Sequence, residues 1–412
     1  MKELLGYFSM EMIKLVIIFA VMIGICAMKK PLWLAALIAS VCGFLLYQVP
    51  VLDGLTAIWQ SISAKSTIQL LILTYVICFL QSMIKKKEGV DRAQKALTRV
   101  FHNNWITCTV APFVVGLLPT APAVFFSGDI IEEAVGDRLT PAQKATAASF
   151  FRHISEAFLP TYSAILTALA LTGIAAGPFV LGMLPMMIVM ELIGCFFLYR
   201  GRVPAKAEGE ASQNKGRDLL TFFISLWPLI VAIILVVGFG LNVLLAIAIV
   251  TIAYFFLDRF AFVQIKPFFK SSFQLKVFLN TLSVYTFKGA LGATGILTKL
   301  PEFFENIPIP AFLIFTLLCF IGTVIAGSLT ITTTMVPVAF ASIPGAGLPL
   351  LCLLMCFIYA AMQISPTHVC LSLSCDHFGT SLGELIKTTL PIILTFMVIV
   401  VLYYMGWTAL IG

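Results

Sequence analysis

Long apolar stretches alternate along the whole chain with short segments that carry most of the charge. Many of these stretches are close to 20 residues, the length that an α-helix needs to cross the hydrocarbon core of a bilayer. The pattern predicts full crossings at about 13–28, 31–47, 66–84, 178–199, 219–238, 241–257, 277–297 and 388–407. We therefore expect an all-α, polytopic membrane protein.

Two further apolar stretches, at about 105–135 and 308–342, are interrupted in the middle by turn-forming residues. The first interruption is Leu118-Pro119-Thr120-Ala121-Pro122, and the second is Ala326-Gly327-Ser328-Leu329-Thr330. Each arm is too short to span a bilayer, and irregular backbone at membrane depth has to be shielded by protein. Both stretches are therefore predicted to be re-entrant hairpins.

Two apolar helices, at about 141–172 and 349–378, each contain a proline break. Pro160 lies in Leu159-Pro160-Thr161-Tyr162 and Pro366 in Ser365-Pro366-Thr367-His368, and the two prolines are 206 residues apart in a chain of 412. Proline removes a backbone donor and interrupts a helix. Broken hydrophobic segments at matching positions of two halves indicate a transporter binding site.

The same order of crossings, hairpin and broken helix occurs in residues 1–200 and again in 219–412, with a charged cytoplasmic linker at 201–218. With the broken helix counted as a crossing, each half has five crossings, about 10 in total. Because five is an odd number, the second half is predicted to insert upside down relative to the first. The two hairpins then come from opposite faces and meet near the midplane. This arrangement is typical of secondary transporters with inverted repeats.

The composition agrees with a membrane protein, since 60% of the residues are hydrophobic and 11% are charged. The net charge of +7 comes from basic residues in the loops 85–104, 200–218 and 258–276, which predicts that these loops are cytoplasmic and that both termini lie outside. The expected partner is a lipid bilayer and not nucleic acid. None of the ten cysteines forms a Cys-x-x-Cys pair, so we expect neither a disulfide framework nor a structural zinc site.

Ionisable side chains gather at mid-depth in one place, just before the first break. If the helix begins at Pro141, Arg152 lies about 16 Å along it, close to the bilayer centre. Arg152 and Glu156 share a helix face, and a buried arginine needs a partner or water. Two interpretations stay open: an anion clamp (Arg152) beside a carboxylate that handles a coupling cation (Glu156), or a structural ion pair.

Other polar residues at the breaks and hairpin tips extend this candidate site. His153 is either a packed residue or a proton relay, and Lys288 lies near mid-depth of its span. No two histidines have metal-ligand spacing, so no metal and no cofactor is predicted. The candidates for substrate binding are Arg152, Thr120, Pro160, Thr161, Gly327, Ser328, Thr330, Ser365, Pro366, Thr367 and His368. The candidates for the coupling ion are Glu156, His153 and Lys288.

The motifs Phe151-Arg152-His153 with Glu156 and Pro160, and Ser365-Pro366-Thr367-His368-Val369-Cys370-Leu371, resemble a family of prokaryotic integral membrane proteins. This is the domain of unknown function 401 family, in the ion transporter superfamily with carriers of citrate, gluconate, dicarboxylates and arsenite. The resemblance covers nearly the whole chain. The Leu117-Leu118-Pro119 hairpin is also similar, although Ala123-Val124 stands where the family has glycines after the second proline.

The resemblance implies a homodimeric, ion-coupled carrier of small anions in a bacterial or archaeal cytoplasmic membrane, working by an elevator motion. The Ser-Asn-Thr tip signature of sodium–dicarboxylate carriers is missing, so sodium coupling and a dicarboxylate substrate do not carry over. Coupling to H⁺ would rest on Glu156 and the histidines. The sequence thus predicts a secondary transporter of a small anionic solute; the alternatives are a sensor or channel without transport and an intramembrane enzyme.

Overall fold

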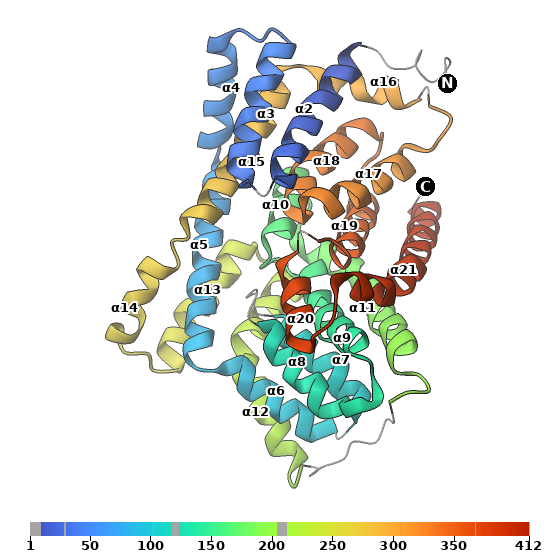
Figure 1. Cartoon of the computed structure of the whole chain (residues 1–412). Helices are drawn as coiled ribbons and strands as arrows, with labels where there is room; N and C mark the ends of the chain where they lie inside the picture. Colours follow the sequence, from blue (N-terminus) through green and yellow to red (C-terminus); the bar gives the residue numbers. More distant parts are fainter. Residues whose placement is uncertain are drawn as a thin grey trace.

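The computed structural model describes residues 10–28, 30–101, 103–117, 123–203, 212–305, 307–366 and 368–411, and their regular structure is helical throughout (Figure 1). The first half contains α2 (Met10–Ala27), α3 (Leu32–Leu46), α4 (Val51–Ser63), α5 (Lys65–Lys86), α6 (Gly89–Phe101), α7 (Asn104–Val115), α8 (Ala123–Val135), α9 (Pro141–Ile154), α10 (Ser163–Thr172) and α11 (Ala176–Tyr199). The second half contains α12 (Lys215–Ile233), α13 (Val243–Leu257), α14 (Phe262–Ser271), α15 (Leu275–Ala293), α16 (Leu300–Glu305), α17 (Ala311–Ala326), α18 (Ser328–Ser342), α19 (Leu348–Met362), α20 (Val369–Phe378) and α21 (Leu382–Ile411).

Five of the described helices are long and apolar enough to cross a membrane. They are Met10–Ala27, Lys65–Lys86, Ala176–Tyr199, Lys215–Gly238 and Leu382–Leu410. The chain is therefore a multi-pass membrane protein, as the hydrophobic pattern predicted. The other predicted crossings correspond to shorter or more polar helices such as α3 and α13, with 15 residues each, and the total of about 10 stays a prediction.

Both helix breaks fall where the prolines predicted them. After α9 ends at Ile154, a single 3₁₀ turn and an irregular segment that contains Pro160 lead to α10. In the second half, α19 ends at Met362 and α20 begins at Val369, with Pro366 between them. The start of α9 is likewise determined by neighbouring residues. The Thr140 hydroxyl accepts a hydrogen bond from the backbone N–H of Gln143, and Pro141 occupies the first helical position.

Three segments between the predicted crossings contain helices that the sequence analysis did not predict. The loop 85–104 contains α6, the segment 48–65 contains α4, and the loop 258–276 contains α14. In α6 the buried residues Val90, Ala93, Ala96 and Leu97 form one stripe, and the helix packs against α12. Such a short amphipathic helix is hard to detect, because the basic residues between its apolar positions suggest a loop.

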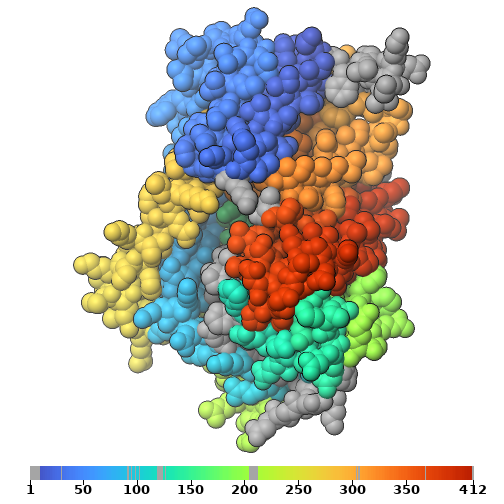
Figure 2. Space-filling view, viewed as in Figure 1, coloured from blue at the N-terminus to red at the C-terminus, as the bar shows by residue number. Residues whose placement is uncertain are grey.

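The two halves pack against each other mainly through exchanged contacts, which are matching pairs of contacts between a helix of one half and a helix of the other. Helix α5 of the first half packs against α13 and α14, and α15 of the second half packs against α3 and α4. In the same way α10 packs on α18 and α20 on α8, while α9 packs on α21 and α11 on α19. Figure 2 shows the orange-red segment of α20 against the blue-green segment of α8. Neither half therefore has a complete set of neighbours of its own.

The hairpin arms lie toward opposite ends of the molecule, with the broken helices between them. Figure 1 shows α7 and α8 near the end formed by α6 and α12, and α17 and α18 near the end formed by α2 and α16. The arms of each pair pack against each other. Gly327, with φ of +87°, joins α17 to α18, so this turn needs a residue without a Cβ. The tip of the first hairpin, at 118–122, lies outside the described residues.

Gly116 marks the closest approach between the first hairpin and the first broken helix. A Cβ at this position would lie 2.0 Å from the Arg152 carbonyl oxygen and 2.5 Å from Ser155 Oγ. The Gly116 carbonyl also accepts a hydrogen bond from the Tyr162 hydroxyl. Because the Gly116 φ is −66°, glycine is needed here for space and not for backbone conformation.

The substitution Gly116→Ala is expected to lower the melting temperature, because the Arg152 carbonyl belongs to a helix and cannot yield without moving α9. Overpacking of this kind costs about 1–3 kcal/mol. Gly24→Ala in α2 is the control, since no atom lies within 4 Å of its new Cβ, and it should leave the melting temperature unchanged or raise it. Equal melting temperatures for the two variants in detergent would contradict the close approach.

Candidate functional site

A cavity of about 370 Å³ lies where the breaks and the second hairpin tip meet. Its walls come from α5, the first break with α10, the start of α15, the start of α18 and the start of α20. Cavities of this size hold small solutes. The lining includes Arg152, Glu156, Thr161, Ser328 and His368, which the sequence analysis proposed from the mid-depth charges, the two breaks and the second hairpin tip.

Three helix N-termini converge on this cavity. Helix α10 begins at Ser163, α18 begins at Ser328, and α20 begins directly after His368, and all three residues line the cavity. The first N–H groups of a helix have no partner within the helix, and together they carry about half a positive charge. Three such ends at one cavity favour a bound anion.

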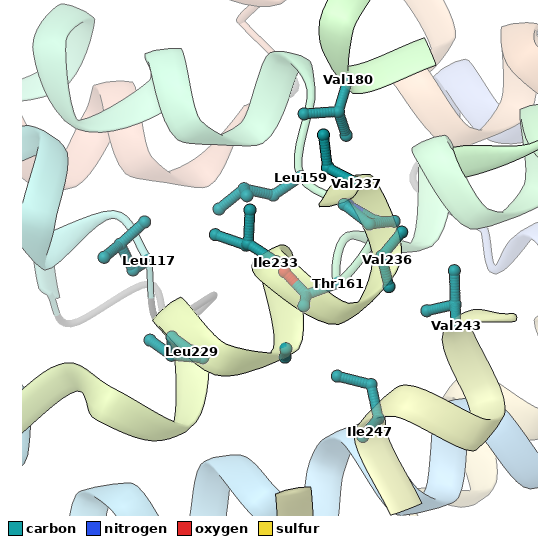
Figure 3. Close-up of a pocket in the computed structure, with 12 residues that line it drawn as sticks. Leu117, Leu159, Thr161, Val180, Leu229, Ile233, Val236, Val237, Val243 and Ile247 are labelled. Atoms are coloured by element: carbon teal, nitrogen blue, oxygen red, sulfur yellow. The ribbon is translucent and has the colours of Figure 1, made fainter. Parts of the chain in front are cut away.

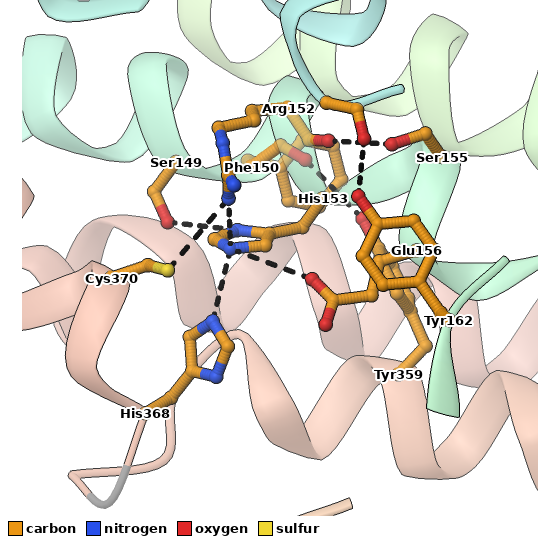
Figure 4. A network of polar contacts seen from close by, with 11 residues as sticks. Ser149, Phe150, Arg152, His153, Ser155, Glu156, Tyr162, Tyr359, His368 and Cys370 are labelled. Carbon is orange, nitrogen blue, oxygen red and sulfur yellow. Dashed lines mark hydrogen bonds and ion pairs between the residues drawn. The ribbon is translucent and has the colours of Figure 1, made fainter. Parts of the chain in front are cut away.

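A polar network of buried side chains lies at one wall of the cavity (Figure 4). Arg152 Nη1 is 2.9 Å from His153 Nε2 and 3.7 Å from Cys370 Sγ, and both Arg152 and His153 are buried. A guanidinium has only donors, so His153 Nε2 accepts and its proton lies on Nδ1, which is 3.2 Å from Ser149 Oγ. This tautomer follows from the hydrogen-bond pattern. Acceptors from both broken helices thus stabilise the positive charge of Arg152.

His368 completes the contact between the two breaks. Its Nε2 lies 3.0 Å from His153 Nε2, and the two rings meet edge to face with centroids 4.7 Å apart. Since His153 Nε2 is an acceptor, the His368 N–H shares its one lone pair with Arg152 Nη1. The histidine predicted to follow the second break therefore meets the first break directly, although the two residues are 215 positions apart in the chain.

Glu156 lines the cavity close to these residues. Its Oε2 is 3.8 Å from His153 Nε2, and its side chain is 23% exposed, whereas that of His153 is fully buried. Glu156 and Arg152 share the cavity, as their common helix face predicted. Arg152, in the last turn of α9, also lies where the helix dipole favours a positive charge.

Other predicted residues have structural contacts or lie elsewhere. Ser365 Oγ is 2.8 Å from the Val324 carbonyl near the end of α17, and Thr330 Oγ1 is 3.6 Å from Cys26 Sγ of α2. Pro366 and Lys288 are exposed, and neither lines the cavity, so the structure does not bring Lys288 to the proposed site. Thr120 and Thr367 lie outside the described residues.

Pro160 lines a different cavity, whose other lining residues are drawn in Figure 3. This cavity of about 30 Å³ is surrounded by apolar side chains such as Leu229 and Val236. Thr161 lines both cavities, and its hydroxyl is buried without a partner among the described residues. The first break therefore borders both a polar and an apolar cavity.

The sequence analysis missed several polar residues around the site. Cys370, Gln81 of α5 and Gln274 at the start of α15 line the cavity. Glu191, in the middle of α11, has one carboxylate oxygen buried with no partner among the described residues. A single carboxylate inside a long apolar span was the available signal for Glu191.

These features define a polytopic helical membrane protein whose broken helices meet around a polar cavity. A family model described as "Protein of unknown function (DUF401)" matches residues 12–406, and the chain belongs to this family. The membership predicted from the paired break motifs is thus confirmed, whereas kinship with the carriers of the superfamily stays a prediction.

The fold is similar to that of a known transporter. The YdaH transporter of Alcanivorax borkumensis, whose crystal structure is described as having an unusual topology, matches with a TM-score of 0.61 and 14% identity. The match covers 86% of this chain and 88% of that chain, and at this identity it shows the fold alone. No curated protein matches the sequence.

The substitution Glu191→Leu is expected to raise the melting temperature, because it removes a buried oxygen that has no partner. Such an oxygen costs about 1–3 kcal/mol. Glu384→Leu should act in the opposite direction, since Glu384 Oε2 accepts a hydrogen bond of 2.7 Å from Thr380 Oγ1 at the start of α21. A lower melting temperature for Glu191→Leu would mean that the carboxylate is stabilised where it is. Higher stability with lost activity would assign it a functional role.

Proposed function

We propose that the protein is a secondary transporter that carries a small anion, such as a carboxylate, through the cavity between its two helix breaks. The observation that carries this proposal is the convergence of Arg152 and three helix N-termini on one cavity of about 370 Å³. Discontinuous helices that point their N-termini at an anion are a recurring device of secondary transporters. The fold that the chain shares with the YdaH transporter is consistent with this proposal.

The charges around the cavity favour an anion over a cation. Arg152 is always protonated, and three partial positive charges from helix ends add to it. Glu156 is the one carboxylate among the described lining residues. An anion that reaches Arg152 would find a positive environment, and Glu156 is the group that we assign to a coupling cation. His153, which lies 3.8 Å from Glu156, connects this carboxylate to Arg152.

We further propose that residues 1–200 and 219–412 are inverted-topology repeats. Support comes from the order of the helices, since α7 to α11 and α17 to α21 follow each other in the same sequence of hairpin, broken helix and long helix. Paired contacts add to it: the contact of α5 with α13 corresponds to that of α15 with α3, and the contact of α10 with α18 corresponds to that of α20 with α8. Paired contacts of this kind are what a two-fold axis between the halves produces, and we place this axis in the membrane plane.

In the proposed motion the hairpins and broken helices move together as one body against α2–α5 and α12–α15. Helices α7, α8 and α9 pack on one another, and so do α17, α18 and α19, while α20 packs on both α8 and α9. The cavity lies at the boundary of the two bodies, since α5 and α15 contribute one wall and the breaks the other. A carrier of this kind exposes the cavity to one side of the membrane at a time.

The test is a thermal melt of the detergent-purified protein against monocarboxylates, dicarboxylates, sugar acids, amino acids and arsenite. An anion at 100 times its dissociation constant should stabilise the protein by about 2.7 kcal/mol. Arg152→Gln should abolish this shift, and Arg152→Lys should weaken it, because lysine keeps the charge without the forked donors. Lys288→Gln is the matched control and should keep the full shift, since Lys288 is exposed and outside the cavity.

A shift that survives Arg152→Gln but is lost in Lys288→Gln would move the site away from the cavity. Shifts with cations or neutral solutes alone would remove the anion from the proposal. Uptake of the stabilising anion into proteoliposomes then separates a transporter from a sensor or enzyme, because binding without flux would contradict transport.

A further inference from the structure

Three metal-ligating side chains come together at the contact between the two helix breaks. The ligand atoms of His153, His368 and Cys370 all lie within 4.8 Å of one another. The histidines belong to different halves of the chain, so sequence spacing could not reveal this cluster. We propose that it is a binding site for a borderline-soft divalent cation of the Zn²⁺ class, which takes the place now occupied by the Arg152 guanidinium.

The geometry of the donors suits such an ion. His153 Nε2 and His368 Nε2 are 3.0 Å apart, close to the roughly 3.3 Å that separates two nitrogens on a tetrahedral zinc with bonds of about 2.0 Å. To bind the ion through Nε2, His368 moves its ring proton to Nδ1, and the Cys370 thiol releases its proton to solvent. Cys370 supplies a sulfur, the softer ligand that zinc, cobalt and cadmium accept readily. Glu156 Oε2, 3.8 Å from His153 Nε2, is close enough to become a fourth ligand after a small rotation of its side chain.

The surroundings orient the imidazole as metal sites require. A ligating histidine usually donates its other ring N–H to a fixed acceptor. His153 Nδ1 has this partner in Ser149 Oγ at 3.2 Å, and that hydrogen bond leaves Nε2 free of its own proton and directed at the cluster. An ion bound by a thiolate and the Glu156 carboxylate would also be neutral overall, which lowers the cost of holding it at membrane depth.

The position of Arg152 means that it competes with the metal ion for the same ligand atoms. Its Nη1 is 2.9 Å from His153 Nε2 and 3.7 Å from Cys370 Sγ, so the guanidinium lies against two of the three donors. A metal ion and the guanidinium cannot both bind these ligand atoms, because both carry positive charge and both need the same lone pairs. Metal binding therefore requires Arg152 to swing away. The ion would join α9 to α20 and hold the two breaks together.

The experiment is a Co²⁺ titration of the full-length, detergent-purified protein, followed by absorption. Tetrahedral Co²⁺ with a thiolate ligand gives intense visible bands and a sulfur-to-metal charge-transfer band, and Zn²⁺ should displace it. Cys370→Ser should abolish the charge-transfer band, whereas Cys375→Ser, a buried cysteine of the same helix, should keep it. His368→Gln should weaken Co²⁺ binding at least tenfold, and His377→Gln, outside the cluster, should not.

Arg152→Gln gives the decisive result, since it should strengthen Co²⁺ and Zn²⁺ binding at least tenfold by removing the competing cation. Unchanged or weaker binding in this variant would overturn the competition that we propose. Absence of a charge-transfer band in the wild type, or its persistence in Cys370→Ser, would overturn the site and leave the cluster as a hydrogen-bonded contact. Each variant is first checked by its melting temperature without metal, and a Zn²⁺-induced increase in melting temperature that His368→Gln and Cys370→Ser both lack is the second readout.

The proposal does not depend on anion transport, because its readouts are metal binding and stability. Failure of the anion panel with an intact cobalt signal would remove the proposed function and keep the metal site. The reverse outcome would keep the anion site and remove the metal.

Discussion

The need to give a buried guanidinium its acceptors organises the centre of this molecule. A charge at membrane depth is tolerated only when protein groups or water surround it. Arg152 finds an acceptor in its own helix, His153, and another in Cys370 of the second half. His368 then closes the contact between the two breaks. The arginine thereby ties together two segments that lie more than 200 residues apart.

A second constraint acts on the backbone. In a bilayer, irregular segments survive only where protein covers them or where they line a cavity. The first break meets both conditions, since Thr161 faces the polar cavity on one side and the small apolar cavity on the other. Gly116 and Tyr162 hold the first hairpin against this break through a short backbone approach and a hydrogen bond. The break is thus covered by elements that the sequence places nearby, the hairpin before it and the helix after it.

The sequence predicted the helical class, the long spans and both breaks because these depend on local properties: apolar length and the chemistry of proline. It also predicted that Arg152, Glu156 and His368 belong together, because matched breaks imply a shared midplane. It could not predict α6, whose buried apolar positions are embedded in basic residues, or the role of Cys370, whose sulfur contacts Arg152 of the other half. Lys288 does not line the cavity for a related reason: the depth of a residue along a helix can be estimated from the sequence, but the direction of its side chain around the helix depends on its neighbours. Contacts between distant segments are set by packing, and a single sequence carries little information about them.

The exchanged packing of the two halves has a consequence for how the protein is made. Helix α5 leaves the ribosome long before α13 and α14, its main neighbours, and α10 long before α18. Until the second half is inserted, the helices of the first half therefore lack these packing partners, and Arg152 lacks its contact with Cys370. Contacts of such long sequence separation form slowly and leave intermediates exposed to wrong partners. The final packing of this fold is consequently a late step, because the first helices find their partners only after the last helices are inserted.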